Sequence, residues 1–146
     1  MKLDGQAALV TGGASGLGAA TAKALASAKV KVAILDTDIE GGKAIAKEID
    51  GIAIECDVSN EQSGERAIEI ARKNHGPARV LINCAGIGPA ERIVGKTGPM
   101  PLDNFRRVIE INLIGSFNLM RLAAADMMNL DLSLIHISEP TRREGI

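Results

Sequence analysis

The segment Thr11–Gly18 carries the residues best suited to bind a phosphate group. It reads Thr-Gly-Gly-Ala-Ser-Gly-Leu-Gly and lies between an apolar run, Ala7–Val10, and an alanine-rich run, Ala19–Ala28. Glycines permit positive φ angles and let a ligand approach where a Cβ would block it. A helix that begins after such a turn directs unpaired N–H groups and its positive dipole end at a phosphate. The order strand, glycine turn, helix therefore predicts a nucleotide site.

The glycine spacing alone leaves two interpretations open. It is G-x-x-x-G-x-G at positions 12, 16 and 18, not the dinucleotide fingerprint G-x-G-x-x-G, and such a turn also serves to pack a helix closely on a sheet. Asp36 favours a nucleotide, because it ends the next apolar run, eighteen positions after Gly18. A carboxylate there accepts both ribose hydroxyls and repels a 2′-phosphate. Since neither Thr37 nor Asp38 is basic, NAD is favoured over NADP.

The elements that must position these groups alternate along the chain. Nearly continuous apolar runs predict strands covered on both faces, over Ala7–Thr11, Lys31–Asp36, Ile52–Asp57 and Arg79–Ala85. Apolar residues at three- and four-residue spacing predict helices over Gly16–Ala28, Ile39–Ile49 and Asn60–Asn74, and a long helix that opens at Leu102-Asp103 after an irregular loop. The fold class is α/β, a truncated doubly wound (Rossmann-like) parallel sheet of order 3-2-1-4, with the tail available as an extra strand.

Composition excludes several classes of protein. The chain is 46% hydrophobic and 24% charged with a formal net charge of −1, so no nucleic acid or anionic membrane is expected as a partner. The N-terminus lacks the apolar region of a signal peptide, and no apolar stretch is expected to reach the length of a membrane span. Cys56 and Cys84 have no metal-ligand spacing, so we predict buried thiols, no metal site and a cytoplasmic location, or the mitochondrial matrix if a targeting segment was lost.

At these separations the motifs resemble the short-chain dehydrogenase/reductase family. The matching segments are Thr11–Gly18, Asp36, Asp57-Val58, Asn83-Cys84-Ala85-Gly86 and Ile111-Asn112-Leu113. Residues 85–87, 95–102 and 112–118 look most like the type-2 3-hydroxyacyl-CoA dehydrogenases of that family. The resemblance implies an NAD-binding Rossmann-type domain over residues 1–129. It also implies a small-molecule substrate, an acyl-CoA or a secondary alcohol, and a parent protein that is a homo-oligomer.

The resemblance also implies a role for each matching residue. Ser15 and Leu17 would contact the pyrophosphate and the nicotinamide end, with space made by Gly12, Gly16 and Gly18. Asp36 would hold the adenosine ribose. The adenine pocket would be lined by Asp57 and Val58, and the ribose-facing wall by Cys84, Ala85 and Gly86. Asn112 matches the asparagine that holds a water of the proton relay, and it is the one catalytic candidate.

The family's acid/base pair is missing from this chain. The reaction is reversible hydride transfer between NAD and a secondary alcohol, in which a tyrosine exchanges the alcohol proton and a lysine lowers the pKa of that tyrosine. The sequence has no tyrosine, and no lysine follows Lys96. The intact parent is therefore expected to be an NAD-dependent oxidoreductase, whereas this chain is predicted to bind NAD weakly or not at all and to be inactive.

The tail, residues 130–146, leaves alternatives open. Leu134–Ser138 is either a fifth strand ending in the catalytic serine or part of a non-family, artefactual tail that resembles a translated sequencing adapter; the second interpretation is favoured. Two other functions fit part of the pattern. One is a non-catalytic nucleotide-binding or interaction module. The other is a methyltransferase-type Rossmann domain, which the Thr-Gly opening and Asn83–Gly86 disfavour.

Overall fold

Four parallel strands form the main sheet of the computed structural model, which describes residues 3–96, 98–128 and 130. In the order β3-β2-β1-β4, the sheet contains β3 (Ile52–Glu55), β2 (Lys31–Asp36), β1 (Ala7–Thr11) and β4 (Val80–Asn83). The predicted order 3-2-1-4 is confirmed. β3 and β4 end earlier than predicted. The chain leaves β3 at Cys56 and β4 at Cys84 and forms a loop after each. The extra strand predicted from the tail lies outside the described residues.

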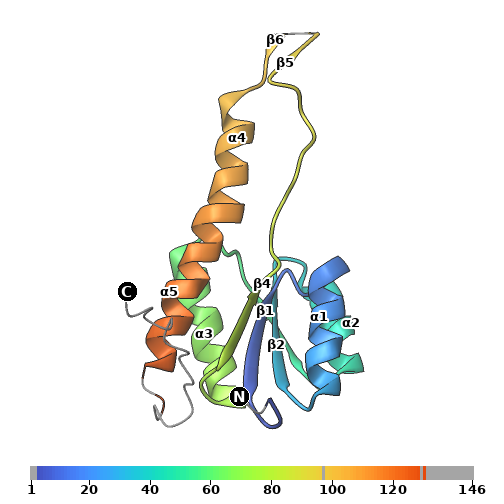
Figure 1. Cartoon of the computed structure of the whole chain (residues 1–146), viewed down its shortest axis with the longest axis vertical. Coiled ribbons are helices and arrows are strands. Elements are labelled where there is room, and N and C mark those ends of the chain that lie inside the picture. Colours follow the sequence, from blue (N-terminus) through green and yellow to red (C-terminus); the bar gives the residue numbers. More distant parts are fainter. Residues whose placement is uncertain (1–2, 97, 129, 131–146) are drawn as a thin grey trace, which may run out of the picture.

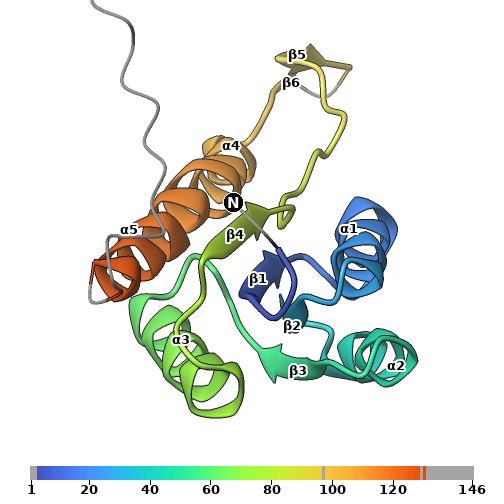
Figure 2. The ribbon, with the colours of Figure 1, turned by 60° about the horizontal axis from the view of Figure 1, so that its bottom comes forward.

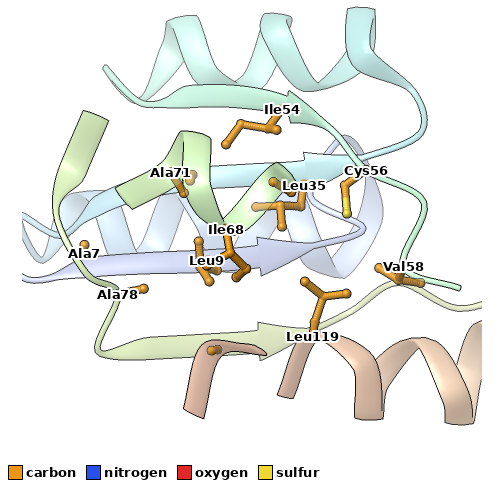
Figure 3. Packing of buried hydrophobic residues seen from close by; sticks show 13 residues of the cluster. Ala7, Leu9, Leu35, Ile54, Cys56, Val58, Ile68, Ala71, Ala78 and Leu119 are labelled. Carbon is orange, nitrogen blue, oxygen red and sulfur yellow. The ribbon is translucent and has the colours of Figure 1, made fainter. Parts of the chain in front are cut away.

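Helices cover both faces of this sheet, as the continuous apolar runs predicted. α1 (Gly16–Ser27) and α2 (Ile39–Glu48) lie on one face, and α3 (Glu61–His75) and α5 (Ser116–Met127) on the other (Figures 1 and 2). Successive strand residues point to opposite faces. Val10 and Ile34 therefore belong to the cluster under α1 and α2. Leu9, Leu35 and Ile54 belong to the cluster under α3 and α5, which Figure 3 shows.

The segment between β4 and the long helix leaves the sheet at its carboxyl edge. It was predicted to be an irregular loop, and most of it is. It differs from the predicted loop in one respect: it contains a short antiparallel hairpin of two two-residue strands, β5 (Val94–Gly95) and β6 (Gly98–Pro99). This hairpin and α4 (Leu102–Ile109) project beyond the sheet edge in Figure 1.

The predicted long helix runs from Leu102 to Met127 and contains a π-helical segment. α4 continues into η1 (Glu110–Gly115) and then into α5. π-Helical turns inside α-helices frequently occur at functional sites. An 18-residue window of this 26-residue helix has a mean hydropathy of 1.3, so the prediction that no stretch reaches the length of a membrane span is wrong by length and composition. Only 22% of that window is buried, and α5 packs against α3 and β4.

Candidate functional site

A cavity of about 870 Å³ lies at the carboxyl edge of the sheet. Its lining includes all eleven residues that the sequence assigned to cofactor binding, namely Gly12, Ser15, Gly16, Leu17, Gly18, Asp36, Asp57, Val58, Cys84, Ala85 and Gly86. They come from the carboxyl end of β2 and from the segments that follow β1, β3 and β4. Open parallel α/β sheets bind ligands at this edge. The convergence of these residues is observed, and their contacts with a cofactor stay predictions.

The glycine turn forms a cradle that side chains would fill. Gly12 has φ +63°, and a Cβ on it would lie 2.7 Å from the Ala85 nitrogen. A Cβ on Gly18 would overlap the carbonyl oxygen of Gly12. α1 begins at Gly16, and the side chain of its N-cap, Ser15, makes no capping hydrogen bond. Because the first N–H groups of a helix need a partner, this turn suits a phosphate group.

Asp36 is held beside this turn by the backbone. Its Oδ2 accepts the Ala14 N–H at 2.9 Å, and its Oδ1 accepts the Asp38 N–H at 3.0 Å. The carboxylate is therefore oriented before any ligand arrives. Each carboxylate oxygen can accept a further hydrogen bond. The geometry thus fits the predicted partner, a ribose with two free hydroxyls.

Thr11 connects the glycine turn to the end of β4, a role that the sequence analysis missed. It is only 1% exposed, and its Oγ1 accepts the N–H groups of Cys84 and Ala85, both at 3.1 Å. A buried hydroxyl needs such partners, because an unpaired one costs about 1–3 kcal/mol. A hydroxyl at the end of an otherwise apolar strand is the sequence signal that points to this role.

The two cysteines lie in different environments. Cys56 is buried, and burial raises the pKa of its thiol to about 11, against the opposite effect of a hydrogen bond with Ser63. Cys56 therefore stays protonated at neutral pH. Cys84 is half-buried, where the sequence predicted a buried thiol. Within residues 3–96, 98–128 and 130, no group of three or more His, Cys, Asp or Glu side chains is placed to hold a metal ion.

Asn112 lies in η1, and both the oxygen and the nitrogen of its amide bond to the backbone of one residue, Ile87. Its Oδ1 accepts the Ile87 N–H at 2.8 Å, and its Nδ2 donates to the Ile87 carbonyl at 2.9 Å. Its own backbone carbonyl accepts the Ser116 hydroxyl at 2.7 Å. The side chain thus clamps the loop after β4 to the long helix. Asn112 does not line the cavity itself, and the water-holding role predicted for it stays a prediction.

Charged side chains from α4 and η1 complete the cavity and were also missed by the sequence analysis. Asp103, Arg106, Arg107 and Glu110 line it opposite the glycine turn. These residues recur every three or four positions, on the side of the helix away from its apolar stripe. That spacing is the sequence signal that could have identified them. Arg106 and Asp103 form an exposed ion pair of 2.9 Å, which contributes little stability.

Comparison with known proteins gives the family of this chain. The model of the short chain dehydrogenase family matches residues 6–137. The chain belongs to the short chain dehydrogenase family. The resemblance inferred from the motifs is thus confirmed.

Curated relatives are similar over most of this chain. It is 38% identical to human 3-hydroxyacyl-CoA dehydrogenase type-2 over 127 residues, which cover 84% of this chain and 49% of the relative. It is 34% identical to the mitochondrial borneol dehydrogenase of Lavandula x intermedia, over 80% of this chain and 44% of the relative. The chain therefore spans about half the length of these relatives.

Solved structures share the fold. A hydroxysteroid dehydrogenase from Escherichia coli superimposes with a TM-score of 0.78 at 30% identity, covering 86% of this chain and 54% of the other. A 3-ketoacyl-(acyl-carrier-protein) reductase from Brucella melitensis, complexed with NADH, gives a TM-score of 0.75 at 33% identity. It covers 82% of this chain and 49% of the reductase.

Proposed function

We propose that this chain is the cofactor-binding half of an NAD-dependent dehydrogenase and that its cavity binds NAD weakly. The observation that carries the proposal is the convergence of the glycine turn, Asp36 and the Asp57-Val58 loop on one cavity. The volume of about 870 Å³ lies within the usual range of ligand pockets, about 300–1,000 Å³. Family membership supports the dehydrogenase over the methyltransferase alternative.

The residues of the cavity suggest an orientation for the cofactor. The pyrophosphate would lie on the first turn of α1, and the adenosine ribose on Asp36. The adenine would lie against Asp57 and Val58. Bound NAD would supply the hydride acceptor, while the chain's own residues bind and orient it.

The parent activity we propose is oxidation of a 3-hydroxyacyl-CoA or a secondary alcohol by a cytoplasmic or mitochondrial homo-oligomer. Similarity to 3-hydroxyacyl-CoA dehydrogenase type-2 supports this substrate class. The family part is proposed to end near residue 129, with a non-family tail after it. Since the 146 residues include no tyrosine, we expect the chain itself to be inactive. Turnover of 3-hydroxybutyryl-CoA with NAD above the rate without protein would contradict that expectation.

Titration with NADH tests the binding proposal directly. We expect an increase in NADH fluorescence on binding, with NADPH bound at least about tenfold more weakly, because a 2′-phosphate would lie beside the Asp36 carboxylate. Asp36→Asn keeps an acceptor for the Ala14 N–H and removes the charge, so it should bring the two affinities closer together. Binding of S-adenosylmethionine in place of NADH would overturn the proposal in favour of a methyltransferase-type domain.

A second function is supported by the apolar side chains that the long helix exposes. Leu113 is 63% exposed and Phe117 is 60% exposed. Apolar surface of this kind is typical of interaction sites. It favours a non-catalytic interaction module, which would bind another protein whether or not NADH is present.

A further inference from the structure

A buried asparagine of α5 holds the loop that lines the predicted adenine end of the cavity. Asn118 is 5% exposed. Its Nδ2 donates to the carbonyl oxygens of Val58 at 3.0 Å and Asn60 at 3.3 Å. Cys56, Asp57, Val58 and Ser59 all line the cavity. Asn118 therefore reaches this loop from outside the cavity, through its backbone.

The other half of the Asn118 amide is also paired. Its Oδ1 accepts from Nε of Arg121 at 3.2 Å and from Nη2 at 2.8 Å. The same Nη2 lies 2.8 Å from Oε1 of Glu61, in the first turn of α3. A primary amide has two donor hydrogens and two acceptor sites, and here all four are used. A fully satisfied buried network rigidifies the segments that it joins.

Close packing reinforces this connection. A Cβ on Gly115 would lie 2.5 Å from Cγ2 of Val58, and a Cβ on Gly64 would lie 3.0 Å from Nδ2 of Asn118. The long helix therefore packs tightly on the loop at Gly115 and on α3 at Gly64. On the loop's other side, Ser63 Oγ accepts the Asp57 N–H at 3.0 Å. The loop is thus fixed at both its α5 and its α3 contacts.

We propose that Asn118 is a positioning residue for the adenine pocket: it sets the position of Asp57 and Val58, and through them the affinity for the adenine half of a dinucleotide. This inference rests on the proposed binding of NAD. It assigns a role in ligand binding to a residue that does not line the cavity. It also makes the long helix a determinant of cofactor affinity.

The test uses Asn118→Leu, which keeps the side-chain size and removes its hydrogen bonds, in the full 146-residue chain. The matched control is Asp126→Asn, on the same helix two turns further on. Asp126 is 8% exposed and pairs with Arg72 of α3 at 2.9 Å, away from the cavity. The readouts are the Kd for NADH and the Kd for reduced nicotinamide hypoxanthine dinucleotide, which differs only at the adenine edge.

We expect Asn118→Leu to weaken NADH binding about tenfold and to reduce the preference for NADH over the hypoxanthine analogue, as loss of adenine positioning would. Asp126→Asn should lower the Tm without changing either Kd. Arg121→Met, at the exposed end of the network, is a milder variant if Asn118→Leu does not fold, and about a threefold weakening is expected. Equal weakening by the Asn118 and Asp126 variants, or no change in the preference, would overturn the proposal.

Hydrogen exchange in the ligand-free chain separates this inference from the proposed function. If the unsubstituted chain binds no NADH, the proposed function fails, and exchange at the Asp57, Ser59 and Ser63 amides still decides the role of Asn118. Faster exchange at these amides in Asn118→Leu, with no change in Asp126→Asn, supports loop positioning. Unchanged exchange in both variants contradicts it.

Discussion

The sheet and the long helix are both rich in apolar residues, but they differ in burial. Most side chains of the central strands are buried, whereas many apolar side chains of the helix are exposed to solvent. Val10 and Ile34, in the central strands, are fully buried. In the long helix, Leu113 is 63% exposed and Phe117 is 60% exposed, and α4 has no buried residue at all. The buried part of the long helix is Gly115 in η1 and a narrow stripe of α5, which includes Leu119 and Ala123.

An apolar run in the sequence therefore does not by itself show that its side chains are buried. Strand residues point alternately to two faces, and helices cover both faces within this chain. The long helix has one face on α3 and β4, and its other apolar side chains meet no cover among the described residues. Both faces of the sheet are therefore covered within the described residues, whereas one face of the long helix is not.

The largest expected loss of stability is at the glycine turn after β1. Gly18→Ala should destabilise the chain by about 3 kcal/mol or more, because the new methyl group meets backbone atoms of Gly12 that cannot move aside. Gly16→Ala is the matched control: it has φ +51° with open space around it, and should cost about 1–2 kcal/mol from backbone strain alone. Urea unfolding followed by circular dichroism measures both. Equal costs would show that the turn tolerates the clash.

A comparable loss of stability is expected on the buried face of the long helix, but not on its exposed face. Leu119→Ala removes a fully buried side chain and should cost about 2–5 kcal/mol, whereas Leu113→Ala should stay within about 0.5 kcal/mol. The same urea unfolding measures both variants. A cost of several kcal/mol for Leu113→Ala would mean that the exposed face is covered in solution. Sedimentation would then identify self-association, which Phe117→Glu should reduce.

The smallest expected change in stability concerns His75. It is the last residue of α3, the helix that contacts both the sheet and the long helix. Burial, and then the charge of Lys31, lower the pKa of His75 below its ordinary value of 6.5, and its Nδ1 is buried without a hydrogen-bond partner among the described residues. The unfolded chain therefore binds the proton more readily, so stability is present above pH 6.5 and is lost as the pH falls from there toward the folded pKa. Unfolding at pH 7.5 and 5.5 measures this loss. His75→Gln should lose less stability over that interval, and an equal loss would contradict the assignment.

Most of the cofactor edge could be predicted because its signals are local. Each strand and the turn that follows it are contiguous in sequence, as in Thr11–Gly18, and parallel pairing brings the strand ends to one edge. The Asn112 clamp on Ile87 and the Asn118 contact with Val58 join residues 25 and 60 positions apart. No spacing rule predicts such pairs, since they depend on how the long helix lies across the sheet.

The α/β fold, the strand order and the glycine turn could all be predicted from the sequence, which also predicts that Asp36 favours a ribose without a 2′-phosphate. Those properties follow from hydrophobic periodicity, glycine backbone freedom and charge, which act over a few neighbouring residues. The tertiary structure alone decided which face of the helix Leu102–Met127 is buried and placed a π-helical turn at Asn112. It also decided that a buried amide of α5 holds the loop at Val58, because these features exist only once distant segments pack together.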